Sequence, residues 1–407
     1  MAWFKKLALL LITVSPCVTA YPFNKTGRRL ALNLDALEPE AKYIVTLQKD
    51  LTPTQFKNHI AKVNGTYYRS SQDNKQSSPS GLERTYAIGG YRAYSGTFDK
   101  DTIASLWSDA VVAEIELDDY FTVQKLVTQR HAPWGLAALS SKKPGSESYR
   151  YDKSAGNGTF AYVIDTGINT KHVEFGGRAS VGYSVIADDF SDNSGHGTHV
   201  SGIIGGKTFG VAKQTEIIGV KVFLNNGGEN SDVIDGLQWA VRDILAKGRQ
   251  SRSVINMSLG GPYSYALNHA VDAAFEMGIL VVVAAGNDAE PARYSSPASS
   301  SQALTVGAID IQWRRCGFSN FGPEVNIEAP GEDIESAFIA TDNATAILDG
   351  TSMATPHITG LALYLAALEK TKTAKELRDK VLEVAIKDKA KDLTLETPNL
   401  IAHNGAR

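Results

Sequence analysis

The chain has 407 residues, of which 43% are hydrophobic and 21% charged, and its formal net charge is −3. This balance is typical of a globular protein with room for two domains, one of them large. It favours neither nucleic acid nor an anionic membrane as a partner.

The first twenty residues have the pattern of a secretory signal peptide. Lys5 and Lys6 precede an apolar run at 7–14, and Val18-Thr19-Ala20 is a small-residue cleavage site. The run is too short to span a bilayer, which disfavours a membrane anchor. We therefore expect a secreted, extracellular protein.

The region that follows predicts a small α+β domain. The expected elements are a strand at 42–47, a helix at 52–63 that Asn64-Gly65 ends, a hairpin at 86–98, a helix at 99–109 and a strand at 111–117. This order describes a domain that ends near residue 120. Residues 118–141 lack periodicity and are interpreted as the junction between domains.

Beyond the junction, strands alternate with helices in the manner of a parallel α/β sheet. The expected elements are strands at 160–164, 217–223, 253–257 and 279–284, helices at 196–205, 233–245 and 266–277, and a long helix that begins near Ser352. We therefore expect an α/β fold for the larger part of the chain.

Three polar residues stand at the ends of these elements, where α/β proteins place their chemistry: Asp165, His196 and Ser352. Ser352 lies between a glycine-led turn and an apolar helix, so its hydroxyl meets unpaired backbone N–H groups and the positive end of a helix dipole. These conditions suit a nucleophile that passes through an oxyanion. His196 would take the proton from Ser352, and Asp165 would hold the imidazole tautomer.

Each of these residues has a simpler interpretation when taken alone. Ser352 can be only a helix cap. Pro356 agrees with a helix that begins near Ser352, because a proline is tolerated best in the first turn. An Asp at a strand end is often a turn former. His199, one turn from His196, is a competing base. The joint occurrence of the three residues with their flanks favours catalysis.

The order Asp, His, Ser along the chain is that of the subtilisin arrangement. The motifs at 162–167, 196–199 and 350–356 resemble the three signatures of subtilases, and the resemblance covers residues 127–407. Ala132-Pro133-Trp134-Gly135-Leu136 and the segments 210–213 and 319–322 are similar to the fungal proteinase K group.

This resemblance implies a subtilisin-like three-layer α/β/α fold with a mainly parallel central sheet, preceded by a ferredoxin-like, I9-type inhibitory propeptide. The implied domains are a signal peptide at 1–20, a propeptide at 21–126 with its core at about 42–120, and a peptidase domain at 127–407. The implied activity is that of a serine endopeptidase, made as a zymogen that cleaves itself near Leu126-Val127 and acts as a monomer without a required cofactor.

The resemblance also implies roles for residues around the cleft. Asn287 matches the position of an oxyanion donor, and His199 is structural. Two segments would bind the peptide substrate, Ser258-Leu259-Gly260 and Ala284-Ala285-Gly286, with a third near 226–230 on its other side. Their small residues leave room for an apolar or aromatic P1 side chain and main-chain pairing gives broad specificity; the alternative is that the glycines serve only turns.

Metal binding has weak support in the sequence. At one calcium site of the proteinase K group a carboxylate is expected where this chain has Asn326, and calcium affinity follows the charge of the ligands. Asp392 matches another family position, but a single surface Asp is usually just solvated. We expect no metal site.

Modification sites follow from secretion. Asn24, Asn64, Asn157 and Asn343 are candidates for N-glycosylation, whereas the sequon at Asn256 follows an apolar pair and is expected to be buried. Because Cys17 leaves with the signal peptide, Cys316 has no partner. We expect it to be a buried small hydrophobe rather than a reactive thiol.

Two other functions stay open. A catalytically inactive homologue could act as a binding module, which the presence of Asp165, His196, Ser352 and Asn287 disfavours. A lipase or esterase would need a Gly-x-Ser-x-Gly elbow with the acid and histidine after it, and the sequence around Ser352 lacks that elbow.

Overall fold

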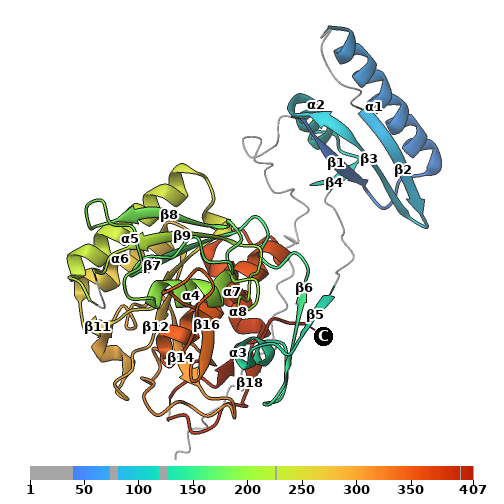
Figure 1. Ribbon diagram of the computed structural model, residues 1–407. Helices are drawn as coiled ribbons and strands as arrows, with labels where there is room; N and C mark the ends of the chain where they lie inside the picture. Colours follow the sequence, from blue (N-terminus) through green and yellow to red (C-terminus); the bar gives the residue numbers. More distant parts are fainter. Residues whose placement is uncertain (1–39, 74–80, 119–125, 225–226, 395, 407) are drawn as a thin grey trace, which may run out of the picture. The chain divides into compact units, whose positions relative to one another are not determined.

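The computed structural model describes residues 40–73, 81–118, 126–224, 227–394 and 396–406. They belong to two compact units, which divide between Thr122 and Val123 (Figure 1). The expected signal peptide and the sequon at Asn24 lie outside the described residues. Among the helices of the described residues, none is long and apolar enough to cross a membrane.

The small unit is a four-stranded antiparallel sheet in the order β2-β3-β1-β4 with two helices. Its elements are β1 (Glu40–Leu47), α1 (Pro53–Asp73), β2 (Gly81–Ile88), β3 (Tyr91–Asp99), α2 (Lys100–Trp107) and β4 (Val112–Leu117). Tyr43, Val45 and Leu47 alternate along β1 toward one core, where Ile103 of α2 joins them. The strand-helix-hairpin-helix-strand order and the ferredoxin-like topology are confirmed.

The larger unit is built around a nine-stranded sheet in the order β18-β19-β15-β14-β12-β10-β7-β9-β8, in which only the β18–β19 pair is antiparallel. The strands are β7 (Phe160–Asp165), β8 (Ala179–Ser184), β9 (Glu216–Lys221), β10 (Ser253–Met257), β12 (Leu280–Ala284), β14 (Leu304–Ile309), β15 (Ile327–Pro330), β18 (Ile386–Lys387) and β19 (Leu400–Ile401). Three short pairs lie beside it: β5 (Leu126–Arg130) with β6 (Ser148–Asp152), β11 (Gly261–Pro262) with β13 (Ser295–Ser296), and β16 (Ile334–Ala337) with β17 (Thr345–Leu348).

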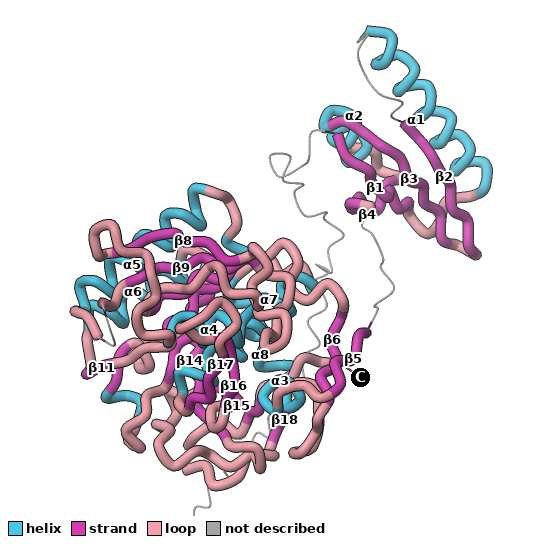
Figure 2. The backbone as a smooth tube through the Cα atoms, viewed as in Figure 1, coloured by secondary structure: helices cyan, strands magenta, loops and turns pink. Residues whose placement is uncertain are grey.

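Helices cover both faces of the large sheet (Figure 2). They are α3 (Trp134–Ala138), α4 (His196–Gly205), α5 (Asn230–Ala246), α6 (Tyr265–Glu276), α7 (Thr351–Glu369) and α8 (Ala374–Val384). Ala161 and Val163 of β7 pack in the core with α4 and α7, whereas Tyr162 and Ile164 pack in the core with α5 and α6. Because β7 is buried on both faces, its sequence is almost continuously apolar. The predicted three-layer α/β/α fold is confirmed.

The first strand of the predicted hairpin begins five residues earlier than expected, at Gly81, and two further differences change the assignment of a segment. Helix α1 continues through Asn64-Gly65 to Asp73, although this pair commonly ends a helix. The segment 118–141, predicted as a junction, contains β5 and α3 of the larger unit. Both elements are five residues long, too short for a periodic pattern to show, and β5 pairs with a strand that begins only at Ser148.

Candidate active site

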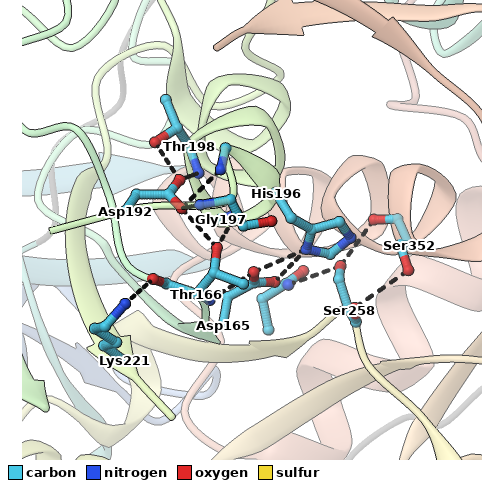
Figure 3. Close-up of polar contacts among 12 residues, drawn as sticks. Asp165, Thr166, Asp192, His196, Gly197, Thr198, Lys221, Ser258 and Ser352 are labelled. Atoms are coloured by element: carbon cyan, nitrogen blue, oxygen red, sulfur yellow. Dashed lines mark hydrogen bonds and ion pairs between the residues drawn. The ribbon is translucent and has the colours of Figure 1, made fainter. Parts of the chain in front are cut away.

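The site lies at the carboxyl-terminal edge of the large sheet. Asp165 is the last residue of β7, His196 the first of α4 and Ser352 the second of α7. After β7 the chain adds β8 and β9 on one side of this strand and then β10 on its other side. The order in which strands are added to the sheet therefore reverses at β7. Ligands of open α/β sheets bind at such reversals. The structure brings together the three residues that the sequence singled out (Figure 3).

Asp165 is fully buried and holds the partly exposed ring of His196. His196 Nδ1 lies 2.8 Å from Asp165 Oδ1 and 3.0 Å from Oδ2, and the N–H of Thr166 donates to Oδ1 at 2.7 Å. Burial, the largest influence, would lower the pKa of His196, but the charge and hydrogen bond of Asp165 outweigh it and the net effect raises that pKa. With Nδ1 engaged by the carboxylate, the other ring nitrogen serves the Ser352 side, where Figure 3 places the ring.

Ser352 is held against the segment that follows β10. Its Oγ donates to the main-chain oxygen of Ser258 at 3.2 Å, and Ser258 Oγ donates to the main-chain oxygen of Ser352 at 2.8 Å. That carbonyl is open to Ser258 because its usual helix partner, residue 356, is a proline without an N–H. Asn256 donates to Ser258 Oγ and accepts from Thr359 of α7, so buried amide and hydroxyl groups lie directly beneath the serine.

Asn287 follows β12 at the same edge of the sheet. Its Oδ1 accepts from both the N–H and the hydroxyl of Thr351, at 2.9 and 2.8 Å. Because the amide oxygen is taken by these two donors, the hydrogen-bond network directs Nδ2 as the free donor. Gly350 precedes the helix with a φ of 145°, a value that favours glycine. This geometry agrees with a donor role for the Asn287 amide beside Ser352.

Two adjoining cavities, of about 790 and 550 Å³, meet at Ser352 and Asn287. The residues predicted to bind substrate border them: Ser258, Leu259 and Gly260 line the first, and Leu259, Gly260, Ala284, Ala285 and Gly286 line the second. Gly227, Gly228 and Asn230, from the segment predicted on the opposite side, line the first cavity. Because Leu259 and Gly260 line both cavities, the two form one continuous cleft that passes Ser352.

The comparisons with known proteins agree with this geometry. The model of the subtilase family matches residues 156–402, and that of the peptidase inhibitor I9 family matches residues 42–124. The chain belongs to the subtilase family. Alkaline protease 1 of Aspergillus flavus is 45% identical over 404 residues, 98% of each chain. The subtilisin-like proteinase Mp1 of Magnaporthiopsis poae is 43% identical over 413 residues, 100% of this chain and 99% of the relative.

A crystal structure of a cold-adapted subtilisin-like serine proteinase superposes with a TM-score of 0.64 at 38% identity. It covers 68% of this chain and 100% of its own. The protein is thus a subtilisin-like serine endopeptidase with an I9 inhibitor domain. The lipase or esterase alternative is wrong, and nothing in the comparisons supports an inactive homologue.

Two residues of the subtilase domain with reactive side chains lie away from this chemistry. His199 is fully buried, and its Nε2 lies 3.1 Å from the main-chain oxygens of both Ile334 and Ala346. Burial lowers the pKa of His199 to about 4, so the ring stays neutral and ties α4 to neighbouring strands. Cys316 is also buried, and burial raises the pKa of its thiol. A thiol that is not ionised is a poor nucleophile, so Cys316 behaves as a small hydrophobe.

The two residues compared with family calcium positions, Asn326 and Asp392, both have polar neighbours in the structure. Asn326 Oδ1 accepts from the N–H of Thr305 at 2.8 Å, so this oxygen is occupied within the sheet. Asp392 is exposed and lies 4.0 Å from Arg314. Among the described residues, no group of three or more His, Cys, Asp and Glu side chains could hold a metal ion.

The sequons differ in exposure. Asn157 and Asn343 are exposed in loops and Asn64 is exposed on α1. Asn256 is fully buried with both amide atoms in hydrogen bonds, which leaves no room for a glycan.

Sequence reasoning missed the residues that hold the predicted ones in place. The sequence shows Thr351 only as part of the motif around Ser352, whereas in the structure its hydroxyl donates to the Asn287 amide oxygen and fixes it. Phe338 lines the first cavity and lies so close to Gly195 that a Cβ there would meet its ring at 2.4 Å. The only local signal for this packing is the glycine before His196, whose φ is 88°.

Proposed function

We propose that Asp165, His196 and Ser352 are the catalytic residues of a broad-specificity secreted endopeptidase. Ser352 Oγ attacks the peptide carbonyl carbon while its proton passes to His196, and Asp165 stabilises the imidazolium. His196 then gives this proton to the leaving amine as the C–N bond breaks. Water then attacks the acyl-enzyme. His196 takes a proton from this water and gives it to Ser352 Oγ as the acid product leaves. The observation that carries the proposal is the meeting of these three side chains at the mouth of an extended cleft in a subtilase.

Asn287 is proposed as the side-chain donor to the oxyanion. The pinning of its oxygen by Thr351 supports this role, since the amide need not turn when the charge develops. The segments at 258–260 and 284–286 are proposed to bind the extended substrate. No metal or organic cofactor enters this chemistry.

Labelling by a serine-directed phosphonate tests the catalytic assignment. The mature wild type should take up one label and then lose activity on casein, whereas Ser352→Ala, freed of its propeptide by an added protease like the other variants, should take up no label and should not cleave casein. His196→Ala, which keeps the hydroxyl but removes its base, should label only very slowly. An intact wild type that never labels would contradict the proposal.

The second cavity also bears on the P1 side chain. Its small walls, Ala284, Ala285 and Gly286, support a preference for large apolar or aromatic P1 residues. Asp288 and Glu290 line the same cavity, and their N–H groups are held by Asn320. We expect P1 lysine to be cleaved as a secondary substrate because its ammonium can approach these carboxylates.

A pair of peptides that differ only at P1 tests this specificity. Asp288→Asn should lower kcat/KM for P1 lysine by roughly two- to fivefold, the size expected of an exposed charge pair. The P1 phenylalanine peptide is the internal control and should be unaffected. An equal loss on both peptides would assign Asp288 to the loop and not to specificity.

We further propose that the chain is a zymogen, with a signal peptide at 1–20, an inhibitory propeptide at 21–126 and a mature monomer from about Val127. The I9 match at 42–124 supports this arrangement, and Asn157 and Asn343 are its preferred glycan sites. Cleavage is proposed to be autocatalytic. Ser352→Ala should accumulate uncleaved; if it matures to the wild-type size without another protease, autoprocessing is wrong.

A further inference from the structure

A second buried carboxylate, that of Asp192, lies beside the Asp165–His196 pair (Figure 3). Asp192 is 9% exposed and accepts five hydrogen bonds. Its Oδ1 accepts from the hydroxyl of Thr166 at 2.8 Å and from the N–H groups of Ser194 and Gly195 at 3.1 and 2.8 Å. Its Oδ2 accepts from the N–H and the hydroxyl of Thr198 at 2.9 and 2.6 Å. A carboxylate with this many charge-assisted bonds is fixed in position.

These bonds complete the first turn of α4, the helix that His196 begins. The residue at the N-cap is Gly195, which has no side chain to accept from the first N–H groups. Asp192 supplies that acceptor from three residues upstream, and its charge faces the positive end of the helix dipole. The main chain on both sides of His196 is thereby tied to one carboxylate.

Thr166 ties the same carboxylate to the other partner of the pair. It follows Asp165 directly, and its Oγ1 donates to Asp192 while it accepts from the N–H of Gly197 at 2.9 Å. Gly197 in turn lies so close that a Cβ would meet the main-chain oxygen of Gly167 at 2.1 Å. The end of β7 and the start of α4 are therefore joined by hydrogen bonds as well as by the Asp165–His196 contact.

Lys221 also binds to the segments that carry Asp165 and Asp192. It is the last residue of β9 and is buried, and its Nζ donates to the main-chain oxygens of Thr166 and Ser191 at 2.8 Å each. These two residues adjoin Asp165 and Asp192 in the chain. The lysine thus holds both acidic segments and places a positive charge among them.

We propose that Asp192 is a positioning residue of the reaction: through Thr166 and the first turn of α4, it holds Asp165 and His196 in the geometry that lets His196 take the proton of Ser352. The proposal rests on the catalytic roles proposed above for Asp165, His196 and Ser352. It assigns no contact between Asp192 and the substrate.

Asp192 also acts on His196 through its charge. After burial and Asp165, the charge of Asp192 contributes to the raised pKa of the imidazole. The other charged or titratable groups around the pair are Lys221 from β9, Asp189 from the preceding loop, 3.8 Å from Lys221, and the buried, neutral His199 of α4. Loss of the Asp192 charge should therefore lower the pKa of His196.

The variant Asp192→Asn tests both consequences, because it keeps the size of the side chain but turns one acceptor into a donor that faces existing donors. Rates are expressed per active site titrated with a phosphonate, so incomplete maturation does not count as lost catalysis. We expect kcat to fall by roughly tenfold to a hundredfold with KM little changed, as for a small misplacement of reacting groups. We also expect the acidic limb of kcat/KM to move to lower pH.

A matched control is Asp188→Asn, which removes a charge from an exposed position of the same loop. Its φ of 58° suits Asn as well as Asp. This variant should keep the wild-type kcat and acidic limb.

Two variants of Thr166 decide the matter if Asp192→Asn does not fold. Thr166→Val removes the hydroxyl that joins the two segments and leaves the Asp192 charge in place. It should lower kcat by roughly tenfold. Thr166→Ser, which restores the hydroxyl, should recover most of that loss.

The proposal is overturned if Asp192→Asn keeps the wild-type kcat and acidic limb, or if Thr166→Val, used in its place, keeps the wild-type kcat, whatever the change in melting temperature. Asp192 would then be only a helix cap. Failure of the underlying assignment has a different signature. In that case the wild type would not be labelled by the phosphonate, or the Ser352→Ala variant would still be active.

Discussion

The small unit and the larger unit each bury an ionisable side chain, and the two side chains are of opposite kind: one is a base and the other an acid. His59 of α1 is 5% exposed, with Nε2 3.2 Å from the hydroxyl of Tyr94 and Nδ1 3.6 Å from Asp109. Burial lowers the pKa of His59, with Asp109 opposing that shift and Lys62 adding to it. The neutral imidazole is therefore the form that fits the small unit.

Glu328 of β15 is fully buried in the larger unit, and within the described part of the chain neither of its carboxylate oxygens has a hydrogen-bond partner. It lies over Gly307 of β14, where a Cβ would meet Oε2 at 2.4 Å. Burial raises its pKa to about 8, and the charge of Arg315 only partly opposes this. The neutral carboxyl is the form that fits the larger unit.

The same physical cause, removal of a charge from water, thus gives the two units opposite responses to pH. For His59 the folded pKa lies below the unfolded value of 6.5, so stability falls as the pH drops below that value. For Glu328 the folded pKa lies above the unfolded value of 4.5, so stability falls as the pH rises from 4.5 through about 8. Through these two residues, acid destabilises the small unit and a rise in pH destabilises the larger one.

The largest expected effect is at Glu328. Above its folded pKa, the charged side chain costs the larger unit about 5 kcal/mol, at 1.36 kcal/mol for each unit between pH 4.5 and about 8. Glu328→Gln should remove most of the loss of melting temperature between about pH 5 and pH 8.5, the range in which the wild-type carboxyl loses its preference for the folded state. Calorimetry on the Ser352→Ala background, which prevents self-digestion, measures it.

An exposed glutamate on a nearby strand gives the control. Glu335→Gln should leave the pH dependence of the wild type unchanged. If it flattens the profile as much as Glu328→Gln does, the general charge of the unit and not one buried carboxyl sets the response.

A smaller effect should separate the two units by the size of their cores. Ile103 of α2 and Ile244 of α5 are both fully buried, and replacement of either by Ala costs about 3 kcal/mol. A unit as small as residues 40–118 has little stability to spare. Ile103→Ala should therefore unfold it, whereas Ile244→Ala should leave the larger unit folded.

Hydrogen exchange read by mass spectrometry reports the two units separately in the full chain. We expect the amides of the small unit to exchange fully in Ile103→Ala. In Ile244→Ala, the amides of the larger unit should stay protected. Equal protection in both variants would show that the smaller core is not the weaker one.

The smallest effect is expected at His59. His59→Gln should make the small unit less sensitive to acid, because the replacement has no proton to gain. Its urea midpoint should change less than that of the wild type between about pH 7.5 and 5. If the variant is as acid-sensitive as the wild type, His59 is not the cause, and the acid sensitivity comes from Asp109 or Lys62, the charged neighbours of the imidazole.

Much of the larger unit could be predicted because its sequence carries the physical constraint directly. Strand β10 and helix α4 have the predicted bounds, since a fully buried strand must be apolar and α4 begins after a glycine. Asp165, His196 and Ser352 were found because they stand at element ends in a diagnostic order. The predicted sheet edge then follows from parallel strands, whose carboxyl ends share one side.

What could not be predicted depends on contacts between distant residues. Asp192 and Thr166 are 26 positions apart, and only the fold brings their side chains to 2.8 Å. Nothing in the local sequence of Thr351 indicates that it holds Asn287, 64 positions away. The burial of Glu328 was also missed, because a lone acidic residue in a short strand usually predicts an exposed position.

Pro356 has a consequence for how force passes through the site. Because its missing N–H leaves the Ser352 carbonyl to the hydroxyl of Ser258, the main chain of the nucleophile is bonded to the segment along which substrate is proposed to lie. A displacement of that segment must carry Ser352 with it. A peptide that displaces Ser258 when it binds would therefore also displace the main chain of Ser352, before any covalent bond of the peptide is broken.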